Sequence, residues 1–122
     1  MKLAILISGG RTGSDFFQSL LDGHSEILSL PGVFFFEEYL EELNKRNINS
    51  AELFVQMYKK FFDSRLNKHE RHDQLGTNKN EFYKIDENIF IKHFNEINKN
   101  DNEYELLKNL HLAYSFAKGE SN

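Results

Sequence analysis

A change of hydrophobic period near the N-terminus limits the folds that this chain can adopt. Residues 3–7 form a continuous apolar run, which is typical of a strand covered on both faces in a parallel sheet. Residues 8–13 read Ser-Gly-Gly-Arg-Thr-Gly and indicate a turn. From Ser14 the apolar residues recur at helical spacing, until Asp22-Gly23 closes the segment. The pattern predicts a strand, a glycine turn and a helix in that order.

Residues 27–30 predict a second short strand, which Pro31-Gly32 would end. A strand, turn, helix and strand make one βαβ unit, and such units build parallel sheets. We therefore expect an α/β fold: a three-layer fold of the P-loop type with a short parallel sheet, in which residues 1–32 form the βαβ unit.

The chain is predicted to be mostly helical after residue 33. Residues 33–43 favour one helix, whose start could be loop, and residues 53–62 place large apolar side chains on one face of another. Residues 68–79 are polar and predict a loop. The expected helix boundaries are N-caps at Ser50, Asp86 and Asp101 and a stop at Gly119. We interpret residues 1–122 as a single domain that is incomplete, because no further strand follows to extend the sheet.

Composition argues against several classes of function. The net charge of −4 argues against a nucleic-acid-binding surface. There is no Cys, which excludes disulfides and thiolate metal sites. His69 and His72 are three residues apart without an evident third ligand, so no metal site is expected. No stretch approaches the ~20 apolar residues of a membrane span, and we expect a cytoplasmic protein with no membrane segment.

The candidate site is the glycine turn and the start of the helix after it. At a helix N-terminus, backbone N–H groups converge and the helix dipole favours an anion. Glycine lets the backbone approach that anion closely, and a guanidinium fits oxyanions in a planar fork. The acidic side chain in the segment could cap the helix or hold the arginine. The residues are Gly10, Arg11, Thr12, Gly13, Ser14 and Asp15. They predict a site for a phosphate group.

Two common nucleotide motifs do not fit this segment. A Walker A loop requires a lysine after its last glycine, and here Ser14 follows Gly13. The dinucleotide pattern Gly-x-Gly-x-x-Gly is also missing. The sequence argues against an ordinary ATPase and a dinucleotide-binding fold.

Residues 3–32 resemble the N-terminal signature of sulfotransferases. The resemblance rests on Ile5-Leu6-Ile7-Ser8-Gly9-Gly10-Arg11-Thr12-Gly13-Ser14, Phe17-Gln18-Ser19-Leu20-Leu21-Asp22-Gly23-His24 and Ile27-Leu28-Ser29-Leu30-Pro31. Asp15 departs from the pattern, because many members have Ser or Thr there, and Ser25 stands where a Pro usually follows the His. Sulfotransferases are about twice as long as this chain, so the resemblance implies an N-terminal portion.

The resemblance implies a donor, a reaction and a type of acceptor. The family's loop binds the 5′-phosphosulfate of 3′-phosphoadenosine 5′-phosphosulfate (PAPS), and here Arg11, Thr12, Gly13 and Ser14 would hold it. The expected reaction is sulfuryl transfer to a hydroxyl-bearing small-molecule or glycan acceptor, without a metal. An unpaired edge of the incomplete sheet would favour self-association.

Sulfuryl transfer also needs a base, and four side chains are candidates without a motif to choose between them: Glu37, Glu38, His93 and His111. Three alternative functions stay open. The chain could be a non-catalytic remnant, or a kinase-like enzyme that uses Arg11 in place of the Walker lysine. It could also be a helical interaction module built on residues 33–118.

Overall fold

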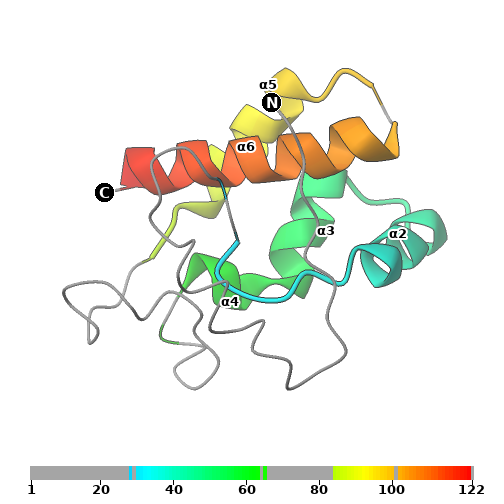
Figure 1. Cartoon of the computed structure of the whole chain (residues 1–122), viewed down its shortest axis with the longest axis horizontal. Coiled ribbons are helices and arrows are strands. Elements are labelled where there is room, and N and C mark those ends of the chain that lie inside the picture. Colours follow the sequence, from blue (N-terminus) through cyan, green and yellow to red (C-terminus); the bar gives the residue numbers. More distant parts are fainter. Residues whose placement is uncertain (1–27, 29, 64, 66–83, 101, 122) are drawn as a thin grey trace.

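The described part of the chain is helical (Figure 1). The computed structural model describes residues 28, 30–63, 65, 84–100 and 102–121. Its helices are α2 (Phe36–Lys45), α3 (Ser50–Met57), α4 (Lys59–Phe62), α5 (Glu87–Ile97) and α6 (Glu103–Ser121). In Figure 1, α6 lies across α3, and the segment that precedes α2 passes beside α4 and α3.

The expected α/β fold with a short parallel sheet is wrong. Among the described residues there is no strand, and the β pairing there is an isolated antiparallel bridge between Asp63 and Lys84. Leu28 and Leu30, which were predicted to lie in the second strand, are outside any strand. Leu30 instead packs among the side chains of helices, with 5% of its surface exposed. The rest of the predicted βαβ unit, residues 1–27 and 29, lies outside the described residues. The predicted loop at 68–79 lies outside them as well.

The predicted helices after residue 33 are largely confirmed, with changes at their ends. The helix predicted over 33–43 begins at Phe36. The apolar face predicted over 53–62 is divided between α3 and α4. The division falls at Tyr58, whose backbone (φ −125°, ψ 43°) leaves the helical region.

Side-chain caps explain where the helices start. Asp86 accepts from the backbone N–H groups of Asn88 and Ile89, which confirms the predicted cap of α5. The prediction of Ser50 as a cap is wrong by one residue, because Asn49 accepts from the N–H groups of Ala51 and Glu52. Asn102 takes the same role for α6, accepting from Tyr104 and Glu105. The predicted cap Asp101 lies outside the described residues.

The predicted stop at Gly119 is wrong, since α6 continues to Ser121. A glycine costs a helix about 1 kcal/mol relative to alanine, which tertiary packing can outweigh. Ala117, two residues earlier, is fully buried and holds this end of α6 against the core.

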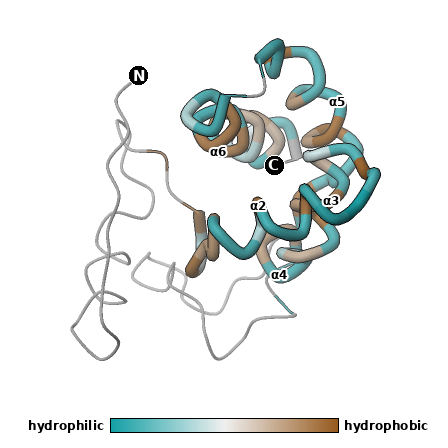
Figure 2. Tube along the Cα trace, turned by 90° about the vertical axis from the view of Figure 1, so that its right-hand side faces the viewer, coloured by the Kyte–Doolittle hydropathy of each residue, from teal (hydrophilic) through white to brown (hydrophobic). Residues whose placement is uncertain are grey.

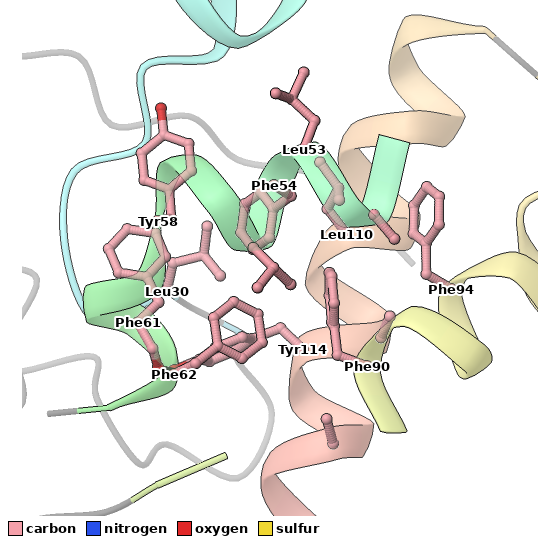
Figure 3. Close-up of a cluster of buried hydrophobic side chains, with 14 of the residues drawn as sticks. Leu30, Leu53, Phe54, Tyr58, Phe61, Phe62, Phe90, Phe94, Leu110 and Tyr114 are labelled. Atoms are coloured by element: carbon pink, nitrogen blue, oxygen red, sulfur yellow. Dashed lines mark hydrogen bonds between the residues drawn. The ribbon is translucent and has the colours of Figure 1, made fainter. Parts of the chain in front are cut away.

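The core is built around aromatic rings (Figure 3). Phe54 of α3 is fully buried at its centre. Its ring lies 5.3 Å from that of Phe34, 6.0 Å from Phe62 and 5.3 Å from Phe90, measured between centroids. These partners come from three segments, so one side chain of α3 joins the segment before α2 to α4 and α5.

α6 closes the core from the other side. Its inner face carries small and aliphatic side chains, and the fully buried Leu110 lies beside α3 and α5 in Figure 3. The Tyr114 hydroxyl donates to the carbonyl of Phe61 at 2.6 Å, which ties α6 to α4. The buried amide of Asn109 donates to Asn98 at 2.9 Å and holds the connection from α5.

Candidate functional site

All six predicted site residues lie outside the described residues: Gly10, Arg11, Thr12, Gly13, Ser14 and Asp15. The structure describes the chain that leads away from them, beginning at Leu28. Residues 28–35, without Ser29, are called the linker below. The linker is therefore the described segment nearest in sequence to the predicted loop.

The inner side of the linker is packed tightly against α4. Leu30 is buried, and Gly32 lies against the ring of Phe61. A Cβ at residue 32 would lie 2.9 Å from Cε1 of that ring, which is closer than real Cβ contacts. Because Phe61 is only 3% exposed and has little room to move, the packing requires glycine here.

Tyr58 holds the end of the linker through two backbone hydrogen bonds. The Phe35 N–H donates to the Tyr58 hydroxyl at 3.1 Å, and that hydroxyl donates to the Phe35 carbonyl at 3.4 Å. The break between α3 and α4 places Tyr58 for this role, and in Figure 3 its hydroxyl points away from the rings of the core. We call this arrangement the Tyr58 clamp.

Next to the clamp, the side chains of the linker point alternately toward the core and toward solvent. Phe34 points inward, with its ring centroid 5.1 Å from that of Tyr58 and 5.6 Å from that of Tyr39. Val33 and Phe35, on either side of it, are 52% and 57% exposed. This alternation is that of an extended chain, in which neighbouring side chains point to opposite sides. The structure therefore presents two large apolar side chains to solvent from a fixed backbone.

Burial and charge both act on the clamp. Desolvation raises the pKa of Tyr58, the bond to the Phe35 backbone opposes this, and the negative charge of Glu38 raises the pKa further. Tyr58 is therefore a neutral hydroxyl at ordinary pH, able both to donate and to accept.

The four candidate bases lie in different surroundings. Glu37 and Glu38 are exposed in the first turn of α2. The ring of His93 stacks on Phe116, with centroids 3.8 Å apart and planes 9° apart. Burial lowers the pKa of His111, and the smaller effect of its bond to the Leu107 carbonyl opposes this. The structure does not bring these four side chains into one group.

His111 has a defined tautomer. Its Nδ1 lies 2.8 Å from the Leu107 carbonyl oxygen, which can only accept, so Nδ1 carries a proton. In the neutral ring Nε2 is then the basic atom.

Metal clusters and membrane spans are both absent from the part of the chain that the structure describes. No group of three or more His, Asp or Glu side chains is placed there to hold a metal ion. None of the helices in the described ranges is long and apolar enough to cross a membrane.

Comparison with known proteins gives no relative: no family model, no curated protein and no solved structure matches this chain. The resemblance of residues 3–32 to sulfotransferases therefore stays a prediction from the sequence.

Sequence reasoning missed the Tyr58 clamp. The sequence places Tyr58 on the apolar face of a helix, and nothing local signals that its hydroxyl bonds a residue 23 positions earlier. The one available signal was that Tyr, unlike Phe, carries a hydroxyl that needs a partner when it is buried.

Proposed function

We propose that the chain binds PAPS through residues 10–15 and takes part in sulfuryl transfer to a hydroxyl-bearing small molecule or glycan. The observation that carries the proposal is the sequence Gly10-Arg11-Thr12-Gly13-Ser14, which combines glycines, hydroxyl donors and a guanidinium. These are the groups that bind an oxyanion.

The end of the stretch that resembles sulfotransferases is anchored on the helical body. The stretch that resembles sulfotransferases ends at residue 32, and there Gly32 fits closely against Phe61 of α4. Leu30, within the same stretch, belongs to the buried core.

In the proposed reaction the acceptor oxygen bonds to the sulfur of the donor. The bond from sulfur to the bridging oxygen breaks, and the proton of the acceptor hydroxyl passes to a general base. The products are a sulfate ester and adenosine 3′,5′-bisphosphate. Negative charge develops on the bridging oxygen, so Arg11 and the backbone N–H groups near it would stabilise the transition state. The cytoplasmic location expected from the sequence stays a prediction.

Calorimetric titration with adenosine 3′,5′-bisphosphate tests the donor site, with ATP and magnesium as the comparison ligand. We expect selective binding of the bisphosphate. Arg11→Ala should weaken it by about 10- to 100-fold, because hydrogen bonds to charged groups are worth about 1.5–3 kcal/mol. Arg46→Ala is the matched control, since Arg46 is exposed at the end of α2 and pairs with Glu42.

Three outcomes would contradict the proposal. Preferential binding of ATP with magnesium would favour the kinase-like alternative. No binding by a chain that still unfolds cooperatively would favour the non-catalytic remnant. Unchanged binding by Arg11→Ala would show that the loop is not the site.

A further inference from the structure

The outer side of the linker is an apolar surface that the fold itself creates. Val33 and Phe35 are more than half exposed, and Leu28, earlier in the linker, is 40% exposed. Three of the large apolar side chains that the described structure exposes thus come from one short segment. Exposed apolar side chains are ordinary when scattered, but a group of them marks an interaction site.

Their exposure does not come from a loose backbone. The Tyr58 hydroxyl bonds both the N–H and the carbonyl of Phe35. Phe34, between the two exposed residues, packs edge-on against Phe54 with an interplanar angle of 82°. Val33 and Phe35 cannot turn inward unless Phe34 leaves the core. Pre-ordered apolar anchors of this kind lose little entropy when a partner covers them.

Acidic side chains adjoin the apolar surface. Glu37 and Glu38 lie in the first turn of α2, which begins directly after Phe35, and both are exposed. Glu38 also acts electrostatically on the Tyr58 clamp that holds Phe35. Figure 2 shows the hydrophobic linker continuing into the hydrophilic start of α2.

These carboxylates are not neutralised by the described part of the chain. Within it, Glu37 and Glu38 form no ion pair. Glu42, one turn further on, lies 3.9 Å from both Lys45 and Arg46. Negative charge is therefore left at the end of α2 that lies next to the linker.

The charge decides which partner fits. A nucleic acid or an anionic membrane would be repelled by Glu37 and Glu38. A second copy, docked by a two-fold axis through this surface, would bring the same carboxylates against each other. A segment with both apolar and basic side chains would cover Val33 and Phe35 and pair with the carboxylates.

We propose that Val33, Phe35, Glu37 and Glu38 form a docking surface for a basic amphipathic segment of a partner protein. The apolar side chains supply the buried contact, and the carboxylates select the charge and speed association. The surface does not depend on the proposed sulfuryl transfer, since all four residues belong to the helical body and its linker.

A pair of synthetic peptides tests the docking surface. One carries leucine and lysine at helical spacing and a single tryptophan, and the other has glutamate in place of each lysine. Because the chain has no Trp, peptide fluorescence reports binding without background from the protein. We expect the lysine peptide to bind, with affinity that falls as salt rises, and the glutamate peptide not to bind.

Two sets of variants locate the peptide on the protein. Val33→Ser with Phe35→Ser should weaken binding at least ~10-fold, as expected for truncated anchors. Glu37→Gln with Glu38→Gln should weaken it several-fold and flatten its salt dependence. Phe116→Ser and Glu103→Gln are the matched controls, since both side chains are exposed on α6. Each variant is checked for a cooperative thermal transition.

The proposal is overturned if the two peptides bind equally, or if neither binds. It is also overturned if the controls weaken binding as much as the linker variants do. Analytical ultracentrifugation is the last test. If the chain forms a dimer that dissociates in the Val33→Ser, Phe35→Ser double variant, the surface belongs to a second copy of this chain and the proposal is overturned.

Discussion

Aromatic rings from distant segments hold the chain between Leu30 and Phe62, whereas the starts of α5 and α6 are held by caps from residues next to them in sequence. In the first region Phe54 contacts rings from several segments, and the Tyr58 clamp fixes the backbone of Phe35. In the second, Asp86 caps α5 and Asn102 caps α6 through bonds to backbone N–H groups two and three residues later.

The two regions depend on contacts of different range. Ring contacts in the first region join residues far apart in sequence, so its backbone is set only when the core assembles. The starts of α5 and α6 are set by residues next to them in sequence. The first region should therefore respond to substitution as a whole, and the second should respond locally.

The largest effect is expected for Phe54→Ala. Removing a fully buried ring leaves a cavity and should cost about 3–5 kcal/mol of unfolding free energy. It should also loosen the linker, because the Phe54 ring supports Phe34. Urea denaturation measures the loss, with Phe116→Ala at an exposed position as the comparison. A loss below about 1 kcal/mol would show that rings do not hold the first region together.

A smaller effect is expected for Asp86→Ala at the start of α5. The loss of the cap's two hydrogen bonds should cost about 1 kcal/mol. Hydrogen exchange should speed up in the first turn of α5 and leave Phe35 in the linker unchanged. Faster exchange throughout the linker would contradict the local character of the second region.

The smallest effect concerns pH and His111. Burial lowers the pKa of this imidazole, so the unfolded chain binds the proton more readily than the folded one. The stability it contributes is complete above its unfolded pKa of about 6.5 and is lost as the pH falls from there toward the folded value. Urea titrations at pH 5 and pH 7.5 measure the difference. His111→Gln should reduce the pH dependence, and an unchanged slope would mean that His111 does not titrate as its burial implies.

The success of sequence reasoning follows the same division between local and distant contacts. Asp86 was predicted as a cap because a cap is decided within a few residues. The Ser50 prediction missed by one position because Asn49, a cap former of equal strength, stands beside it. Gly119 was predicted to end a helix because glycine disfavours helix interiors, and the packing of α6 overrides this preference.

The fold class and the docking surface could not be predicted from residues that are neighbours in sequence. The α/β prediction depended on residues 1–32, and Leu28 and Leu30, the described members of the second predicted strand, form no strand. Leu30 is placed by distant helices, and Phe35 faces outward because of a hydroxyl 23 residues away. The six predicted phosphate-binding residues, Gly10 to Asp15, remain a prediction of the sequence alone.

Hydrogen exchange at the Phe35 amide tests the central claim, that the Tyr58 clamp fixes the linker with Val33 and Phe35 outward. Tyr58→Phe removes the hydroxyl while keeping the ring that packs on Phe34. We predict slow exchange at Phe35 in the natural chain, and exchange faster by several-fold to about 10-fold in Tyr58→Phe, since a hydrogen bond contributes about 0.5–1.5 kcal/mol. Tyr104→Phe, at an exposed position, is the control. Equal exchange in the natural chain and Tyr58→Phe would contradict the claim.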